Sequence, residues 1–386
     1  MNQTTTARRA DVRHGSIPPE ARAVLTIDLA ALRANWRKLD EVSGRAECAG
    51  VIKADAYGLG LEEIARALRD EGCSTFFVAT LAEASRVRYV HPSATIYVLD
   101  GLLPGAAAYY AGFDLRPCLS SLAEVREWAA FCDATGRRLR AAVHIDTGLN
   151  RLGLSADEVG ALAAELTLFD HFELALVMSH LACADEQAHP MNAAQRAKFE
   201  TLRAMLPKAP ASLANSGGIF LGPDYHYDLV RPGIAIYGGR AFIGLPNPMQ
   251  WVVRLQARIL QIREVGAGEP IGYGATFRTE RASRVATLAC GYADGFLRAL
   301  SGTAVNPGPV GYIGNYPVPV VGRVSMDLIT VDVSEVPPEL AQRGAWVEVM
   351  GARTTIDDLT DRAGTIGYEL LTRLGRRVHR VYLGGA

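Results

Sequence analysis

Between residues 48 and 237, short apolar segments alternate with amphipathic segments. The apolar segments have the length and residue types of buried strands, and the amphipathic segments have the spacing of helices. The strand-like segments cover residues 49–53, 75–79, 94–99, 138–145, 173–178 and 211–214. Strands that alternate with helices in this way predict βαβ units and a parallel sheet. About eight units fit into this stretch, which is typical of a (β/α)8 TIM barrel, although an open doubly wound sheet would give the same local pattern.

From about residue 239 onward the pattern changes to short β-prone segments separated by glycine and proline. They cover residues 251–265, 285–289, 318–321, 328–333 and 345–350, and helical spacing returns at 355–363 and 368–374. A chain of 386 residues favours two domains. We predict a flexible tail over residues 1–23, an α/β barrel over 24–246 and a mainly β domain over 247–386. The first strand, at 24–27, belongs either to the barrel or to the β domain.

The composition restricts the classes of partner. The net charge is -1, which favours neither nucleic acid nor an anionic membrane surface. No apolar run reaches the length of a membrane span, and the polar N-terminus lacks the apolar centre of a secretory signal. Six scattered cysteines without a C-x-x-C pair indicate reduced thiols in a cytoplasm rather than a disulfide scaffold or a zinc site.

Lysine is rare in this chain, since only four of the 40 basic residues are lysines. Among them, Lys53 alone ends an apolar strand-like segment. Arginine stays charged at any working pH, whereas a desolvated lysine amine can lose its proton and attack an aldehyde. The residues alone leave two readings open, a Schiff-base lysine or a lysine at a strand end that reaches into water.

The stretch Val-Ile-Lys-Ala-Asp-Ala-Tyr-Gly at residues 51–58 resembles the cofactor-lysine motif of bacterial alanine racemases. These are fold-type III pyridoxal-phosphate enzymes built from a (β/α)8 barrel and a C-terminal β domain. The resemblance runs from about residue 24 to the C-terminus. It implies that Lys53 carries pyridoxal 5'-phosphate and that Tyr57 binds its phosphate. Without the resemblance, Tyr57 packing over the turn is the simpler reading.

Residues 144–153 form a second motif, His-Ile-Asp-Thr-Gly-Leu-Asn-Arg-Leu-Gly. An arginine after a glycine-containing turn can bind a carboxylate with two hydrogen bonds. The resemblance implies that Arg151 binds the substrate carboxylate. Many family members carry a carbon-dioxide-modified lysine at the position of His144, and histidine cannot carry that group. The substrate selectivity of this chain therefore stays open.

Further strand-end motifs supply the remaining barrel residues. The resemblance places His180 near the cofactor ring and Ser216, Gly233 and Ile234 at the phosphate. It places Arg231 against the pyridine nitrogen. Because arginine keeps its proton, that nitrogen would stay unprotonated, which favours return of a proton to Cα over transamination. Alone, a strand-end histidine or a Ser-Gly-Gly turn is more often structural.

The β domain contains three further motifs of the family. Racemisation needs an acid or base on each face of a planar carbanion. The resemblance implies that Lys53 serves one face and that Tyr273 of the partner subunit serves the other. Met326 would bind the substrate carboxylate, and Tyr292 and Asp327 would line the entrance. A homodimer with two composite sites is then expected.

The resemblance therefore implies an alanine racemase that is expected to supply D-alanine for peptidoglycan. One alternative is a broad-specificity amino-acid racemase that takes serine or basic amino acids. A second is a non-catalytic pyridoxal-phosphate-binding protein, which the β domain argues against. Some relatives place a phosphate-binding tyrosine near the C-terminus, where this chain has Arg376. The sequence fits a biosynthetic and a catabolic role equally.

Overall fold

The computed structural model describes residues 17–385. The chain divides into two compact units. The barrel unit contains residues 33–236 and 240–249, and the β unit contains the described residues up to 32, residues 237–239 and residues from 250 onward. The tail expected over residues 1–23 lies for the most part outside the described residues. Its last residue, Ala23, begins the first strand.

The barrel unit is built on parallel strands that run in chain order. They are β3 (Gly50–Val51), β4 (Thr75–Val78), β5 (Thr95–Val98), β6 (Arg116–Leu119), β7 (Arg140–His144), β8 (Glu173–Met178) and β9 (Ala211–Ser212). All four residues of β4 are buried, as expected for a strand covered on both faces.

The ring closes through β10 (Leu229–Val230), which pairs in parallel with β2 (Glu47–Cys48), the segment that leads into β3. On its other side, the Asp228 amide donates to the Ala211 carbonyl at 3.0 Å, and the Arg231 amide donates to the Ala214 carbonyl at 2.9 Å. β10 therefore lies between β9 and β2. The barrel prediction is confirmed, and an open sheet is excluded.

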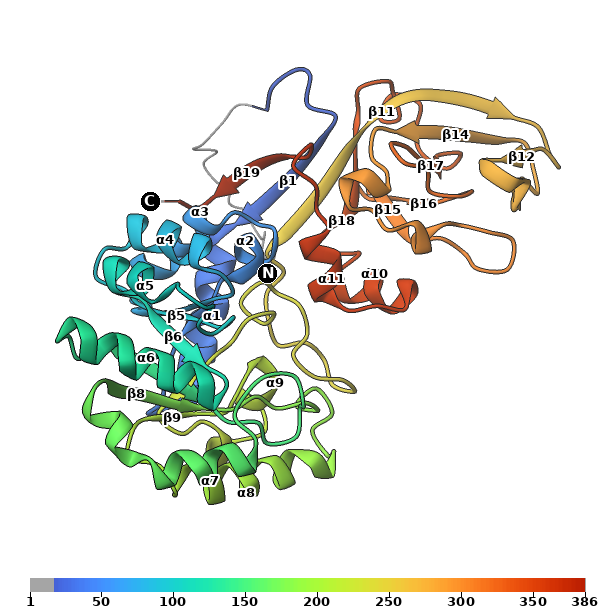
Figure 1. The fold of residues 1–386 in the computed structure, drawn as a ribbon. Helices are drawn as coiled ribbons and strands as arrows, with labels where there is room; N and C mark the ends of the chain where they lie inside the picture. Colours follow the sequence, from blue (N-terminus) through green and yellow to red (C-terminus); the bar gives the residue numbers. More distant parts are fainter. Residues whose placement is uncertain (1–16, 386) are drawn as a thin grey trace, which may run out of the picture. The chain divides into compact units, whose positions relative to one another are not determined.

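Helices follow the strands around the outside of the barrel unit (Figure 1). They are α3 (Leu61–Asp70), α4 (Leu81–Val90), α5 (Ala107–Phe113), α6 (Leu122–Thr135), α7 (Ala156–Ala164), η1 (Leu166–Asp170), α8 (Pro190–Arg203), α9 (Ser216–Ile219) and η2 (Pro223–Tyr225). The segment α2 (Lys53–Tyr57) differs from them, because its inner residues have left-handed backbone angles. The sequence spacing of α3 explains its packing, since Leu61, Ile64 and Leu68 lie on one face and are fully buried. In the chain, α1 (Leu29–Ser43) comes directly after the first strand and before β2.

The β unit is organised on the long strand β11 (Val253–Val265). Its first half pairs with β1 (Ala23–Asp28) and β18 (Trp346–Met350), and its second half pairs with β14 (Ser283–Leu288). A register shift between Ile259 and Gln261 separates the two halves, and such bulges let a strand bend. β1 also pairs in parallel with β19 (His379–Leu383), so the first strand belongs to this sheet.

Shorter elements complete the β unit. They are the hairpin β12 (Pro270–Ile271) and β13 (Phe277–Arg278), strands β15 (Val310–Ile313), β16 (Tyr316–Pro319) and β17 (Ile329–Asp332), and helices η3 (Tyr273–Ala275), η4 (Tyr292–Asp294), η5 (Arg298–Leu300), α10 (Ile356–Ala363) and α11 (Gly367–Thr372). The prediction of a mainly β second domain is confirmed. Within residues 17–385, no helix has both the length and the apolar character needed to cross a membrane.

Candidate active site

Lys53 follows β3 after a single residue, Ile52, and so lies at the carboxyl end of a barrel strand. Chemistry in barrels of this kind is concentrated at that end. The side chain is half-buried, and burial lowers the pKa of its amine. The nearby positive charge of Arg151 lowers the pKa further, while Asp100 and Glu83 oppose the shift. A lysine in this setting releases its proton more easily than one in water, which is what a nucleophilic amine requires.

The four residues after Lys53 form a left-handed turn. The φ angles of Ala54, Asp55, Ala56 and Tyr57 lie between 52° and 57°. Residues with a side chain avoid this region, at a cost of roughly 1–2 kcal/mol each. The turn closes with hydrogen bonds from the Ala56 amide to the Ile52 carbonyl and from the Gly58 amide to the Ala54 carbonyl, at 2.9 and 2.8 Å. Strained backbone of this kind is typical of functional sites.

The turn places the side chain of Tyr57 against the segment that follows β10. Tyr57 is buried, and a Cβ on Gly233 would lie only 2.2 Å from its hydroxyl oxygen. Gly233 is therefore required for this close approach. The Gly233 amide donates to the Ser216 hydroxyl at 2.8 Å, and Ile234 follows in a fully enclosed position. The hydroxyls of Tyr57 and Ser216 thus both lie beside the main chain at Gly233.

Arg231 is buried at the end of β10, with 4 % of its surface exposed. It donates to the Ser212 hydroxyl at 2.5 Å, to the Ser179 carbonyl at 2.6 Å and to Nδ1 of His180 at 3.4 Å. None of these partners carries a negative charge, and burial lowers its pKa to about 10. The guanidinium is still a cation at neutral pH and is held in a fixed orientation.

Two histidines lie beside these cations. Since arginine can only donate, Nδ1 of His180 accepts from Arg231, which leaves the proton of the neutral ring on Nε2. Burial and the neighbouring positive charges hold the pKa of His180 well below its usual value. Burial followed by the charge of Arg231 lowers the pKa of His144 to about 4. Both rings are therefore neutral at pH 7.

Arg151 lies on an exposed turn after β7. The Asp146 carboxylate shapes this turn, because it accepts hydrogen bonds from the amides of Gly148 and Asn150, both at 3.0 Å. The Thr147 hydroxyl contacts that of Ser179 at 2.8 Å and ties the turn to the end of β8. Arg151 also lies close enough to Lys53, His144 and His180 to affect the pKa of each.

In the β unit, Tyr273 stands on η3 between two glycines with positive φ. Its side chain is 72 % exposed. A Cβ on Gly274 would lie 2.9 Å from the guanidinium of Arg323, so this loop packs closely on the segment after β16. Tyr273, Arg323 and Ser325 line a cavity of about 420 Å³.

Tyr292 and Met326 come from two segments joined through their main chains. The Tyr292 amide donates to the Ser325 carbonyl at 3.1 Å, and a Cβ on Gly291 would lie 2.4 Å from the carbonyl oxygens of Ser325 and Met326. The side chains of Tyr292 and Met326 are 42 % and 54 % exposed. The structure thus brings these two predicted site residues together.

Arg377 joins the same two segments through side chains. It donates to the buried Asp294 carboxylate at 3.0 Å and to Asp327 at 2.8 Å. Its neighbour Arg376, which the sequence singled out, is exposed in the segment before β19. This role of Arg377 was missed from the sequence, because its two carboxylate partners are distant along the chain.

Glu83 is a second residue that sequence reasoning missed. It accepts hydrogen bonds from the amides of Asp55, Ala79 and Thr80 at 3.2, 2.9 and 3.3 Å. The signal was present, because Thr80 and Glu83 have the spacing of a capping box, and the structure contains that box. The additional contact with Asp55 joins positions distant in the sequence and could not be predicted from spacing.

Comparisons with known proteins agree over both units. Residues 27–241 match the family described as "Alanine racemase, N-terminal domain", and residues 252–382 match "Alanine racemase, C-terminal domain". The alanine racemase of Methylobacterium nodulans is 50 % identical over 364 residues, which cover 94 % of this chain and 97 % of that protein. A catabolic alanine racemase of Mesorhizobium japonicum is 48 % identical over 366 residues, covering 95 % of this chain and 94 % of the relative.

Among solved structures, an alanine racemase from Bartonella henselae, described with covalently bound pyridoxal phosphate, aligns with a TM-score of 0.88. It is 40 % identical, and the alignment covers 94 % of this chain and 99 % of that one.

Proposed function

This chain belongs to the alanine racemase family, and from that premise we propose that it interconverts L-alanine and D-alanine with pyridoxal phosphate carried by Lys53. The observation that carries the proposal is the setting of Lys53. It is a half-buried amine at the carboxyl end of a barrel strand, and its pKa is lowered by burial and by Arg151.

The residues around Lys53 fit the cofactor. The amine of Lys53 has a lowered pKa, so it can lose its proton and form a Schiff base with the aldehyde of the cofactor. The hydroxyls of Tyr57 and Ser216, beside the main chain of Gly233 and Ile234, suit a phosphate. Arg231 is buried, and its partners Ser212, Ser179 and His180 are uncharged. Such a cation can donate a hydrogen bond to an unprotonated pyridine nitrogen.

When bound, pyridoxal phosphate draws electrons away from the Cα of an attached amino acid and makes the Cα proton acidic. Lys53 moves that proton on one face of Cα. We assign the other face to Tyr273 of the partner subunit, which is supported by the exposure of Tyr273 and by the family resemblance. Each group gives or takes one proton, as a reversible racemisation requires.

Arg231 controls where the proton returns. With a pKa of about 10, its guanidinium donates a hydrogen bond and does not surrender the proton at neutral pH. The ring nitrogen would stay unprotonated, so negative charge would remain closer to Cα. Protonation at Cα is then favoured over the alternative carbon, which suppresses transamination.

We assign the remaining residues to substrate. Arg151, exposed near Lys53, binds the carboxylate, and Met326 contributes a main-chain donor to it. His180 accepts a hydrogen bond from Arg231 and helps to hold it beside the cofactor ring. Tyr292 and Asp327 line the entrance, which is supported by the shared anchoring of their segments.

One observation favours a second candidate, a racemase that also takes serine or basic amino acids. His144 is neutral at pH 7, so it does not supply the negative charge that the modified lysine gives in many family members. The charge beside Arg151 therefore differs from that in many family members. Comparable kcat/KM values for serine or lysine and alanine would favour this candidate, whereas turnover of alanine alone would exclude it.

We further propose a homodimer in the cytoplasm whose D-alanine is used for peptidoglycan. All six cysteines lie within the described residues and are free thiols, which supports a reducing compartment. The exposed Tyr273 and Met326 support a partner that covers them. Growth of a D-alanine-requiring bacterium without added D-alanine, once it expresses this chain, would support the role. Absence of growth despite active enzyme would exclude it.

The reaction itself is tested with purified protein, pyridoxal phosphate and L-alanine, followed by chiral chromatography. D-alanine should accumulate until the two enantiomers are equal. Protein that binds the cofactor but forms no D-alanine from L-alanine would overturn the proposed substrate.

A further inference from the structure

The left-handed turn at residues 54–57 has no glycine to favour its conformation, yet it sets the position of two site residues. Lys53 stands at its start and Tyr57 at its end. The first amide of the turn that donates to a main-chain carbonyl of this segment is that of Ala56. As in any helical turn, the amides before it have no such partner within the segment. Groups outside the turn must therefore hold its first half.

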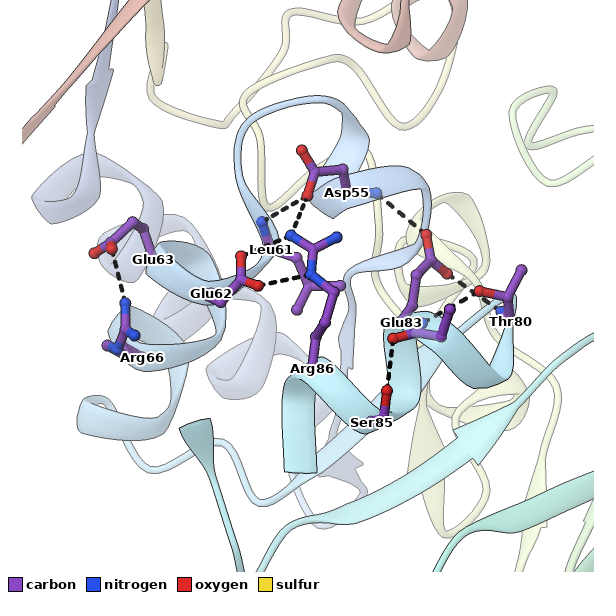
Figure 2. A network of polar contacts seen from close by, with 10 residues as sticks. Asp55, Leu61, Glu62, Glu63, Arg66, Thr80, Glu83, Ser85 and Arg86 are labelled. Atoms are coloured by element: carbon purple, nitrogen blue, oxygen red, sulfur yellow. Dashed lines mark hydrogen bonds and ion pairs between the residues drawn. The ribbon is translucent and has the colours of Figure 1, made fainter. Parts of the chain in front are cut away.

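Glu83, from α4, holds the first half through its carboxylate. One oxygen accepts from the Asp55 amide at 3.2 Å, and the other accepts from the amides of Ala79 and Thr80 at 2.9 and 3.3 Å (Figure 2). The carboxylate thereby joins the turn to the end of β4 and to the start of α4. It is partly buried, which strengthens such bonds relative to exposed ones.

Arg86, one turn further along α4, holds the Asp55 side chain. It donates to the Asp55 carboxylate at 2.8 Å and to both oxygens of Glu62, on α3, at 2.6 and 2.7 Å (Figure 2). The same Asp55 oxygen accepts from the Leu61 amide at 3.2 Å. Both ends of the Asp55 residue, its amide and its carboxylate, are thus fixed by α4.

We propose that Glu83 and Arg86 are positioning residues, which hold the left-handed turn so that the Lys53 amine and the Tyr57 hydroxyl are in place for the cofactor. This inference rests on the proposed function of Lys53. The two residues do not touch the reacting atoms in this assignment. They act through Asp55, with Glu83 making the larger contribution.

Glu83 has a second effect, through charge. Four charged side chains face the Lys53 amine from the barrel unit: Arg151 and Arg231 lower the pKa of the amine, whereas Asp100 and Glu83 raise it. Removing the negative charge of Glu83 should therefore lower the pKa of Lys53 further. A purely structural role for Glu83 would leave this value unchanged.

The experiment compares Glu83→Gln and Arg86→Met with two matched controls in the full chain. Thr80→Ala removes the other half of the α4 capping box without touching the turn. Arg66→Met breaks a neighbouring surface ion pair, Arg66 with Glu63 at 2.7 Å, that has no contact with Asp55 in Figure 2. The Glu83→Gln side chain keeps the size of the original but offers one acceptor oxygen instead of two.

Three readouts are measured: the dissociation constant of pyridoxal phosphate by absorbance, hydrogen exchange of amides 54–60 in cofactor-free protein, and the pH dependence of acetylation of Lys53. Glu83→Gln should weaken cofactor binding by about tenfold or more, as expected for a lost hydrogen bond to a charged group. Arg86 is half-exposed, so Arg86→Met should weaken it only about two- to fivefold. Arg86→Lys should recover part of that loss.

Exchange of amides 54–60 should become faster in Glu83→Gln and Arg86→Met, and the acetylation midpoint of Lys53 should move to lower pH in Glu83→Gln. Both controls should match the parent protein in all three readouts. Equal cofactor binding and equal exchange in Glu83→Gln and the parent would overturn the inference. An effect of Thr80→Ala as large as that of Glu83→Gln would assign the effect to the helix cap and also overturn it. If the parent protein bound no pyridoxal phosphate, the proposed function would fail instead, and the exchange measurement would still decide how the turn is held.

Discussion

The two groups assigned to proton transfer stand in opposite surroundings. Lys53 is half-buried in the barrel unit, with charged neighbours that set its pKa and a turn anchored by α4. Tyr273 in the β unit is 72 % exposed, on a loop between glycines. The barrel unit therefore supplies a tuned environment from its own residues, whereas the β unit presents its tyrosine to the outside.

This difference in exposure indicates what Lys53 and Tyr273 each still need in order to transfer a proton. A tyrosine has a reference pKa of about 10 and is a weak base unless positive charge and exclusion of water assist it. The amine of Lys53 already has burial and cations around it. Arg323 lines the same cavity as Tyr273, but the tyrosine is exposed. Tyr273 would gain exclusion of water when another protein surface covers it, which fits a composite site between subunits.

The largest expected effect is at Lys53. Lys53→Ala should abolish covalent attachment of the cofactor and reduce racemisation by more than about 10⁴-fold, the upper range for a single acid-base group. Absorbance of the bound cofactor and chiral chromatography measure the two losses. Lys198→Ala, at an exposed lysine of α8, is the control and should behave as the parent. Residual covalent attachment in Lys53→Ala would mean that another amine carries the cofactor.

Tyr273→Phe should show that the barrel unit and the β unit have different roles. It should leave cofactor attachment intact and lower racemisation by about 10²- to 10⁴-fold. Tyr316→Phe, at another exposed tyrosine of the β unit, should retain full activity. Full racemisation by Tyr273→Phe would refute the assignment of the second base.

Mixing the two inactive variants tests whether they share one site. When subunits of Lys53→Ala and Tyr273→Phe exchange at random, about a quarter of the sites in the mixture should regain both groups, because half of the dimers are mixed. Activity close to a quarter of the parent value would support a composite site. No recovery despite proven subunit exchange would place both groups in one chain.

The buried histidines predict a pH dependence of stability. In the unfolded chain His144 takes up a proton near pH 6.5, whereas in the folded chain it resists protonation down to about pH 4. The unfolded state therefore binds more protons in this window, so stability is full above about pH 6.5 and falls as the pH is lowered. The contribution of His144 to this loss is about 3 kcal/mol.

Denaturant unfolding of the cofactor-free protein at pH 7 and pH 4.5 measures this loss. His144→Asn should reduce the difference in unfolding free energy between the two pH values. An identical difference in the variant would show that His144 does not resist protonation in the folded chain.

The smallest expected effect is at Arg377, in the β unit. Arg377→Met removes the partner of the Asp294 and Asp327 carboxylates and should loosen the segments that carry Tyr292 and Met326. KM should rise about two- to fivefold with little change in kcat, since Arg377 and Asp327 are half-exposed and the buried Asp294 carboxylate keeps its hydrogen bond from the Gly291 amide at 2.9 Å. Arg376→Met is the neighbouring control. A larger effect of Arg376→Met would restore the sequence-based role of Arg376.

Sequence periodicity predicted most of the barrel, because apolar strand segments and the buried face of α3 are recorded directly in residue spacing. It missed β6, where Pro117 interrupts a four-residue strand, since proline is unusual in a central strand. The left-handed turn could not be predicted either. Ala54, Ala56 and Tyr57 disfavour that conformation, and contacts of Glu83 and Arg86, distant in the sequence, override the local preference.

The central claim is that Lys53 and Tyr273 act on opposite faces of Cα. The most direct test follows the first turnovers of L-alanine in deuterated water by proton NMR and mass spectrometry of the separated enantiomers. The account predicts that newly formed D-alanine carries solvent deuterium at Cα while the remaining L-alanine keeps its proton, and that D-alanine as substrate gives the mirror result. Transfer of the substrate's own α-hydrogen to the product, with equal labelling of both enantiomers, would contradict it and indicate a single base.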